Sequence, residues 1–534
     1  MGNALSLVRI ALAEFLDNLR TFQTLQARIQ RSPGLPLPNP TRSFWSYPPS
    51  PIAAHTSQLP THADFVIIGS GITGASVARR LLDSLHGDGH NVKVLMLEAR
   101  DACSGATGRN GGHISPPLYH DYLSLKRDHG QAVAQKMIKF RLAHLQELRC
   151  VAEEEGILPE SQWREVDTVD AFYDLELFER AKIKVQQYKA DLPFDAEHHQ
   201  VYEAEEAIEK FRLASDSVGC ISWSAGAIHP YQFVTGILAK LLSRYPDDFL
   251  LCTNTPCTSI ASPTSSSPYY TLSTPCGSVT TPHVIHATNG WSATLLENLR
   301  AKIVPFRGNM SAQRPGQSLT APQRSFVFYS AAIGYDYLTQ LPGGECEFML
   351  GGGFAQDGDE GYEAMGNTDD TTYSKRIGAH LSGALPRYFG EDNWGKEGVP
   401  LELGDGTEEW AKGRVKALWS GILGISVDLL PWVGRLPRAV SGRAEPPLSS
   451  VVRSEKEDGA ERLHVGAAPG EWIAAGYSGE GMVHAWLSGK ALAEMILGRE
   501  VEGGLGEWFP DIMRVTEKRW KKAKVENLLD ALKD

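Results

Sequence analysis

After residue 60, the pattern of hydrophobic and polar positions predicts a strand, a turn, a helix and a second strand, in that order. Phe65 to Ile68 is a short apolar run rich in β-branched residues, which predicts a strand buried on both faces of a parallel sheet. Apolar residues then recur at helical spacing: Ala75, Val77, Ala78, Leu81, Leu82 and Leu85. Val92 to Leu97 predicts a second strand, which ends at Glu98. This pattern is typical of a βαβ unit.

The turn inside this unit carries three glycines with a spacing that suits a phosphate. Gly69 permits the tight turn, Gly71 lets a pyrophosphate approach the backbone, and Gly74 lets the helix pack closely on the strand. Free N–H groups at the helix start, around Ile72 and Thr73, would face the phosphates. The carboxylate of Glu98 would hold ribose hydroxyls. The unit therefore predicts an ADP site, which alone suits NAD as well as FAD.

Later segments alternate between helical and strand patterns. Residues 120–214 are expected to be mainly helical, with long helices over Ala132–Glu155 and Leu175–Ala190. Strands are predicted at Phe249–Cys252, Val279–Ala287 and Glu347–Leu350. Residues 261–268 and 441–462 are rich in turn-forming or charged residues and predict exposed loops. From Asp511 onward the pattern suggests a basic, then acidic helix.

The N-terminus has a pattern of its own. Apolar residues recur at steps of three and four from Leu5 to Ile29, which predicts an amphipathic helix, and the prolines between Pro33 and Pro40 end it in an extended tether. Docking of this helix on the protein's own surface is the preferred interpretation over membrane contact. Met1 to Ser6 fits the pattern for myristoylation of Gly2, and a single acyl chain would give only weak peripheral membrane association.

Composition narrows the class of protein. A chain of 534 residues exceeds one ordinary core, so two or three lobes are expected. The formal charge of -12, without a basic block, argues against a nucleic-acid partner. The 7 cysteines are scattered without a C-x-x-C pair, which suits a reducing, cytoplasmic setting and predicts no metal site. No apolar stretch reaches the length of a transmembrane helix.

The segment after Glu98 changes the interpretation from dinucleotide to flavin. Small residues crowd the stretch Arg100–His113, and they allow a backbone to lie against a flat ligand without obstruction. Arg109 and Asn110 add donors. This segment resembles the D-amino-acid oxidase superfamily of FAD-dependent amine and amino-acid oxidoreductases. Its portion Arg109–Gly112 is most similar to the gamma-glutamylputrescine oxidase branch.

Further segments continue the resemblance in order from about residue 62 to 500. They are Gly226–Pro230, which would introduce a helix returning to the FAD lobe; Asn254–Ile260, which resembles a strand meeting the adenine; Ile285–Trp291; Trp419–Gly434; and Gly476–Met482. The last segment is similar to the family's G-x-x-G-H-G-M motif, with Glu480 in place of the histidine. A carboxylate beside an electron-rich flavin would be unfavourable unless it points away or is protonated.

The resemblance implies an α/β fold in which a Rossmann-like FAD-binding domain, built from discontinuous segments, interleaves with a substrate domain of mixed β-sheet and helices. The expected division is residues 1–60 for the N-terminal helix and tether; 61–119, 215–300 and 415–505 for the FAD-binding domain; 120–214 and 301–414 for the substrate domain; and 506–534 for a helical tail.

The resemblance also implies FAD as a non-covalent cofactor. Helix-start N–H groups after Gly479 would stabilise negative charge on the flavin. The residues expected to bind FAD are Gly69, Gly71, Ile72, Thr73, Gly74, Glu98, Ala99, Arg100, Ser104, Ala106, Thr107, Arg109, Asn110, Gly111, Gly112, His113, Cys257, Thr258, Asn289, Gly290, Gly421, Gly479, Glu480, Gly481 and Met482.

The implied reaction is oxidation of the C–N bond of a primary or secondary amine or amino acid to an imine, by hydride transfer to the flavin. Arg307, Tyr335 and Tyr337 are the candidates for positioning the substrate, Met482 is a further one, and no general base is assigned. Glycine-oxidase-like members place an arginine after a Tyr-Leu pair to grip a carboxylate, whereas here Tyr337-Leu338 continues as Thr339-Gln340. This departure favours an amine over a small α-amino acid.

Dioxygen is the expected electron acceptor, with hydrogen peroxide as the product. Three alternatives stay open at this point: an FAD-dependent dehydrogenase that uses another acceptor, an NAD-dependent dehydrogenase, and a non-catalytic, membrane-associated flavin-binding protein.

Overall fold

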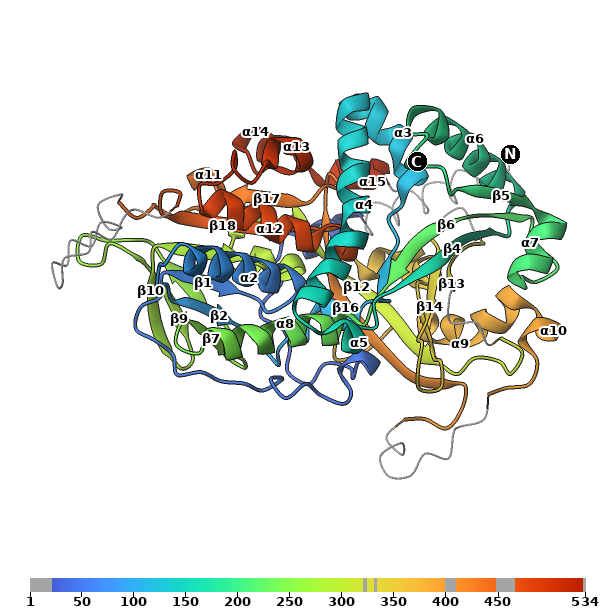
Figure 1. Ribbon diagram of the computed structural model, residues 1–534, viewed down its shortest axis with the longest axis horizontal. Coiled ribbons are helices and arrows are strands. Elements are labelled where there is room, and N and C mark those ends of the chain that lie inside the picture. The colour runs from blue at the N-terminus through green and yellow to red at the C-terminus, as the bar shows by residue number, and fades with distance from the viewer. Residues whose placement is uncertain (1–21, 320–323, 331–333, 399–409, 448–465, 532–534) are drawn as a thin grey trace, which may run out of the picture.

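Two large β-sheets lie side by side in the computed structural model (Figure 1), which describes residues 22–319, 324–330, 334–398, 410–447 and 466–531. One sheet has six strands and the other nine, and a third sheet has three. The chain crosses between the large sheets several times, so each is assembled from segments that are distant in the sequence.

The six-stranded sheet contains the predicted βαβ unit. Its strands, in spatial order, are β17 (Trp432–Arg435), β18 (Gly470–Ala475), β11 (His283–His286), β1 (Phe65–Ile68), β2 (Val94–Leu97) and β7 (Phe249–Cys252). All neighbours are parallel except β17 and β18. All four residues of β1 are buried, as its uninterrupted apolar run predicts.

Three helices lie alongside this sheet (Figure 1): α2 (Ile72–Gly87), α8 (Pro230–Arg244) and α12 (Ala485–Ile496). The helices α2 and α12 approach closely because small residues meet between them. The hydroxyl of Ser76 donates to the Trp486 carbonyl at 2.6 Å, and a Cβ placed on Gly489 would lie 2.8 Å from the Ser76 Cβ. The start of α2 is thereby held against the first turns of α12.

The nine-stranded sheet forms the second lobe. Its strands, in spatial order, are β16 (Val415–Ser426), β12 (Ile303–Gln313), β15 (Phe348–Gly351), β14 (Asp336–Gln340), β13 (Arg324–Tyr329), β4 (Arg164–Phe172), β6 (Gly219–Ala227) and β3 (His113–Ile114), with β5 (Gln200–Glu203) also paired to β6. Neighbours are antiparallel except β13 and β4. The mixed sheet and its helices agree with the fold class expected from the sequence.

The helices around this lobe are α3 (Leu118–His129), α4 (Gln131–Glu154), α5 (Leu158–Ser161), α6 (Leu175–Asp191), α7 (Ala204–Phe211), α9 (Lys375–Phe389) and α10 (Glu391–Trp394). In Figure 1, α4 stands between the two lobes. The small sheet comprises β8 (Ser259–Ala261), β9 (Tyr270–Thr274) and β10 (Gly277–Thr281), and the remaining α-helices are α11 (Arg438–Ser441), α13 (Leu505–Trp508), α14 (Glu517–Lys522) and α15 (Val525–Ala531).

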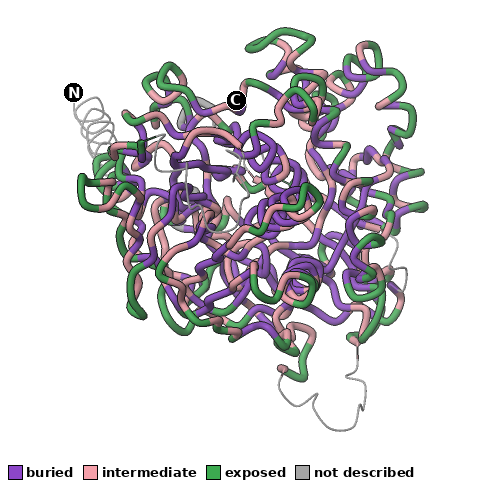
Figure 2. The backbone as a smooth tube through the Cα atoms, turned by 60° about the vertical axis from the view of Figure 1, so that its left-hand side comes forward, coloured by how far each residue is buried: buried purple, intermediate pink, exposed green. Residues whose placement is uncertain are grey.

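Short 3-10 helices complete the described structure. They are η1 (Phe44–Ser46), η2 (Ala106–Arg109), η3 (Asn289–Thr294), η4 (Glu297–Leu299), η5 (Phe354–Gln356), η6 (Gly358–Ala364), η9 (Gly481–Val483) and η10 (Asp511–Met513). Figure 2 shows that buried backbone runs through both lobes, with exposed residues at the periphery. Within the described residues, no helix combines the length and apolarity needed to cross a membrane.

Several sequence expectations about elements are wrong. The expectation for residues 120–214 is confirmed, because α3 to α7 make up most of them and α4 and α6 match the two predicted long helices, although β4 and β5 also lie within them. The others differ from the structure. The strand predicted over Val279–Ala287 is divided into β10 and β11, since Pro282 lacks an N–H group and the two halves join different sheets. Of the segment Asn254–Ile260, only Ser259 and Ile260 belong to a strand, β8, which lies in the small sheet.

The single helix expected from Asp511 onward is also wrong. The described residues form η10, α14 and α15, because Thr516 is extended and caps α14 with its side chain, while Ala523 is extended after it. Residues 215–300 are expected to belong to the FAD-binding domain, but β6, which lies within them, pairs in the nine-stranded sheet of the other lobe.

Part of the N-terminal helix is described. Residues 22–29 are helical, and Leu25 and Ile29 are buried in a cluster with Leu296, Leu299 and Trp432. This piece therefore docks on the protein itself, which agrees with the preferred interpretation. Gly2 and the apolar positions from Leu5 to Leu19 lie outside the described residues, so myristoylation stays a prediction.

Candidate active site

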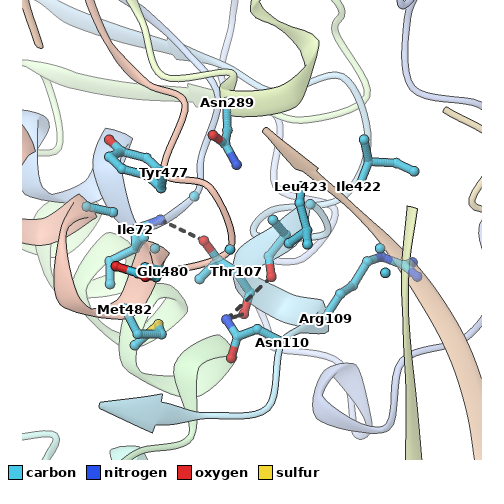
Figure 3. A pocket seen from close by; sticks show the side chains of 18 of the residues that line it. Ile72, Thr107, Arg109, Asn110, Asn289, Ile422, Leu423, Tyr477, Glu480 and Met482 are labelled. Carbon is cyan, nitrogen blue, oxygen red and sulfur yellow. Dashed lines mark hydrogen bonds between the residues drawn. The ribbon is translucent and has the colours of Figure 1, made fainter. Parts of the chain in front are cut away.

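One cavity of about 530 Å³ lies between the lobes, within the size range of small-molecule sites. Its lining comes from separate segments: the glycine turn after β1, the loop after β2, η2, the start of η3, the middle of β16 and the turn before α12. Figure 3 shows Ile72, Glu480 and Met482 on one side of the cavity, with Ile422 and Leu423 on the other.

The glycine turn has no room for side chains. Gly69 has φ +108, and a Cβ there would lie 2.5 Å from the Ala287 carbonyl oxygen. At Gly74 a Cβ would lie 2.1 Å from the carbonyl oxygen of Gly69 itself. The first turn of α2 consequently sits directly against β1, and its N-terminus opens into the cavity, where backbone N–H groups attract phosphate.

Glu98 is held in place by donors from the same turn. Its carboxylate accepts from Ser70 N at 3.0 Å, Ser70 Oγ at 2.7 Å and Arg100 N at 3.0 Å. It lines the cavity and is half-buried, so it can still accept from hydroxyl groups of a ligand. This arrangement suits the ribose role expected of it.

The two arginines of the cofactor loop are occupied by the protein. Arg100 donates from Nη1 to both carboxylate oxygens of Asp370, at 3.1 and 2.9 Å. Arg109 donates to the carbonyl oxygens of Ser104, Thr41 and Ser420, each at 2.8 Å. Burial, with the charge of Arg100, lowers the pKa of Arg109 to about 10. Arg109 therefore ties the loop to β16, and its alkyl stem faces Gly421.

The N-terminal segment (residues 34–47) also takes part in the site. Gly34, Leu35 and Pro36 line the cavity. Ser43 Oγ donates to the Gly108 carbonyl at 2.6 Å, and Trp45 Nε1 donates to the Asn110 carbonyl at 2.5 Å. The tether expected from the prolines is thus bound to the cofactor loop.

Replacing Thr41 by valine is expected to speed the loss of FAD a few-fold and to cost about 1–2 kcal/mol of stability. The Thr41 hydroxyl accepts from Ser420 N at 3.0 Å and donates to the Asp370 carbonyl at 3.0 Å. Valine removes the acceptor of the Ser420 N–H, while the Asp370 carbonyl keeps its bond from the residue 41 backbone N–H at 2.7 Å. Release of flavin fluorescence over time measures the rate. The control is Thr264→Val in an exposed loop, and an equal rate in both variants would contradict a role for the segment.

The turn before α12 presents Glu480 to the cavity. Its carboxylate lies 3.2 Å from Nη2 of Arg141, a buried residue of α4, and Arg141 also pairs with Asp121 at 2.9 Å. Burial raises the pKa of Glu480 to about 7, with Arg141 opposing and Asp121 reinforcing the shift. The backbone of this turn forms η9, so α12 itself starts at Ala485, after the glycines.

The residues present fit FAD. The glycine turn and Glu98 suit the ADP part, and Gly111 and Gly421 line the cavity with backbone atoms alone. Two lining atoms, Nε2 of His113 and Nδ2 of Asn309, are buried without a hydrogen-bond partner among the described residues, and a polar heteroaromatic ring can satisfy them. Burial lowers the pKa of His113 to about 3, so its imidazole is neutral.

Most residues proposed from the sequence line this one cavity. They are Gly69, Gly71, Ile72, Thr73, Glu98, Ala99, Arg100, Ala106, Thr107, Arg109, Asn110, Gly111, His113, Cys257, Asn289, Tyr335, Tyr337, Gly421, Gly479, Glu480, Gly481 and Met482. Gly74, Ser104, Gly112, Thr258, Gly290 and Arg307 do not line it.

Arg307, a candidate for positioning the substrate, does not line this cavity. It lies on β12, where the next three residues, Gly308, Asn309 and Met310, line the cavity. Its guanidinium reaches the Asp369 carbonyl and the Thr372 hydroxyl instead, each at 3.4 Å.

Sequence reasoning missed the far wall of the cavity. Asp121, Asp170, Trp223 and Tyr329 line it from α3, β4, β6 and β13. The one available signal was Asp170, a carboxylate inside an apolar run that a strand would bury. In the described part of the chain, no group of histidine, cysteine and acidic side chains could hold a metal ion.

Comparison with known proteins identifies the family and the fold. The family model described as DAO, FAD dependent oxidoreductase, matches residues 64–495. Glycine oxidase from Geobacillus kaustophilus shares the fold with a TM-score of 0.57 at 17% identity, over 86% of this chain and 99% of that one. L-proline dehydrogenase from P.horikoshii has a TM-score of 0.58 at 17% identity, over 88% and 100% of the two chains.

L-amino acid deaminase from Proteus vulgaris has a TM-score of 0.55 at 15% identity, over 85% of this chain and 95% of that one. No curated protein matches the sequence. At such identities the structural likeness extends to the fold alone.

Proposed function

The chain belongs to the DAO family of FAD-dependent oxidoreductases, and from this membership we propose that it oxidises the C–N bond of an amine or amino acid to an imine. FAD held in this cavity would accept the hydride, and dioxygen would reoxidise it to give hydrogen peroxide. The observation that carries the proposal is the continuity of one cavity, from the phosphate-binding turn at Gly69 to a wall of tyrosines that includes Tyr335 and Tyr337.

Each segment of the cavity has a task in this reaction. Glu98 and the turn at Gly71 hold the ADP part of FAD, while Gly479–Met482 presents backbone donors to the ring. Bound FAD supplies the hydride acceptor. Tyr335 and Tyr337 lie on or next to β14, and their rings stand 6.3 Å apart and form an aromatic wall that orients the substrate.

No side chain is assigned as a general base, since the substrate only needs to bind with its reacting nitrogen unprotonated. Dioxygen as the electron acceptor is part of the proposal. A carrier or a quinone is the alternative acceptor. The resemblance of Arg109–Gly112 to the gamma-glutamylputrescine oxidase branch stays a prediction.

Anaerobic titration of the FAD-loaded protein with amines and amino acids tests the proposal. An accepted substrate should bleach the yellow flavin absorbance, and admission of air should restore it with one peroxide per flavin. Alcohols of the same carbon skeleton are the matched controls. Bleaching by alcohols alone would contradict C–N oxidation, bleaching without peroxide would favour a dehydrogenase, and no bleaching by any amine would favour a flavin-binding protein without this activity.

A further inference from the structure

The far end of the cavity is acidic. We define the acidic end by six lining residues: Asp121, Asp170, Glu480, Trp223, Tyr329 and Tyr335. Among the described residues that line the cavity, lysine is absent and the arginines are Arg100 and Arg109, both at the cofactor loop and bound to Asp370 or to carbonyls. A free carboxylate would therefore meet no arginine at the acidic end.

Asp170 is the most buried of these carboxylates, with 1% of its surface exposed. It accepts from the Tyr119 hydroxyl and from His120 Nε2 at 2.8 Å. Lys184 lies nearby and donates to the His120 carbonyl at 3.3 Å. The described residues give Asp170 no lysine or arginine partner, so its charge is balanced only when His120 is protonated or a cation enters the cavity.

The other two carboxylates of the acidic end share a single guanidinium as their ion-pair partner. Arg141 pairs with both Asp121 and Glu480, and its Nε donates to the neutral imidazole of His484 at 3.2 Å. With both carboxylates ionised, this trio carries one net negative charge. The Asp121 side chain remains 36% exposed, so its carboxylate is open to a ligand.

Aromatic rings surround the same charges. The ring centroids of Tyr335 and Tyr329 are 5.8 Å apart. The ring of Trp223 lies beside that of Tyr119, with a centroid distance of 5.8 Å. Tyr335 is 51% exposed, so its ring is accessible to a ligand. Desolvation raises the pKa of Tyr335, and the charges of Glu480, Asp121 and Asp170 raise it further. Carboxylates combined with aromatic faces are the surroundings that favour an alkylammonium group.

We propose that the substrate is an amine with a second, non-reacting ammonium group, held at the acidic end by Asp121 and Asp170 beside the rings of Tyr329 and Tyr335. This inference rests on the proposed function and deepens it. The acidic end stabilises a protonated nitrogen, whereas the reacting nitrogen must be unprotonated, so the two roles need two nitrogens. A diamine or polyamine meets this requirement, and an α-amino acid does not.

Calorimetric titration of the FAD-loaded protein tests recognition without turnover. The probes are butyltrimethylammonium and pentanoate, which differ mainly in the sign of their charge. We expect the cation to bind at least about tenfold more tightly than the carboxylate. Asp121→Asn should weaken cation binding about fivefold, because one charge contact is lost while Arg141 keeps Glu480 as a partner.

Asp128→Asn is the matched control, since Asp128 lies on the same helix but is exposed and pairs with Arg127. Cation binding should be unchanged there. Equal or tighter binding of pentanoate, no detectable binding of the cation, or unchanged binding in Asp121→Asn would overturn the inference. If Asp121→Asn does not fold, the comparison of the two probes on the unmodified protein decides alone.

Anaerobic bleaching by three amines of one skeleton separates this inference from the proposed function. We expect 1,4-diaminobutane to reduce the flavin faster than butylamine, and butylamine faster than 4-aminobutanoate. Preferential reduction by 4-aminobutanoate or an α-amino acid would overturn the inference and leave amine oxidation intact. Tight cation binding without bleaching by any amine would support the ligand class and contradict the proposed function.

Discussion

Replacing Gly74 by alanine should leave the protein almost without bound FAD. The new Cβ would lie 2.1 Å from the Gly69 carbonyl oxygen, a backbone atom that cannot rotate away. Gly69 cannot retreat, because the Ala287 carbonyl of the neighbouring strand stands against it. Either α2 or the phosphate-binding turn must move. Overpacking of this kind costs about 1–3 kcal/mol, and its upper range corresponds to an affinity for FAD lowered about 100-fold.

The flavin-to-protein ratio after gel filtration and the quenching of flavin fluorescence on rebinding measure this effect. Gly87→Ala is the matched control on the same helix, because no atom lies within 4 Å of the position of its Cβ. Alanine there should keep FAD affinity unchanged. Normal flavin content in Gly74→Ala, or a similar loss in both variants, would contradict the account of the turn.

The features predicted well from the sequence are local. Phe65–Ile68 forms β1 because four adjacent apolar residues can be buried only inside a sheet, and the glycine turn follows from its own spacing. The glycine-rich loop after Glu98 lines the cavity because its small residues leave space for a ligand. These properties are set by neighbouring residues and are visible in a short window.

The acidic end was not predicted because it depends on pairing between distant strands. β4 is a strand because it pairs with β6 and β13, and this pairing brings Asp170 and Trp223 into the wall of the cavity. Side chains alternate along strands, so a shift of one residue exchanges lining and buried positions.

The ionisation of Glu480 shows the same dependence on distant residues. The sequence raised the difficulty of a carboxylate beside the flavin, and its partner Arg141 lies on α4, far away in the chain. Two features of the structure reduce the negative charge of this carboxylate. A buried guanidinium pairs with the carboxylate, and burial raises the pKa of Glu480 to about 7, so a substantial fraction is protonated near neutral pH.

Arg141→Met is expected to lower the free energy of unfolding by about 2–4 kcal/mol near pH 8.5. Arg141 is 4% exposed and is the shared partner of Asp121 and Glu480, so methionine keeps much of the volume but leaves two carboxylates without their cation. The expected loss is below that of a fully buried pair, because the two carboxylates are 36% and 26% exposed. Urea unfolding of the FAD-loaded protein measures it.

The pH dependence of this loss identifies its cause. Glu480 binds its proton more tightly in the folded protein than in the unfolded chain, so its contribution favours folding at acid pH and is lost as the pH rises through about 7. Without Arg141 that pKa rises further, and the deficit of the variant should be smaller near pH 6 than near pH 8.5. Arg149→Met removes an exposed arginine from the same helix, where a surface pair contributes little, and should change stability little at either pH. A deficit that is the same at both pH values would assign the loss to packing of the side chain instead of its charge.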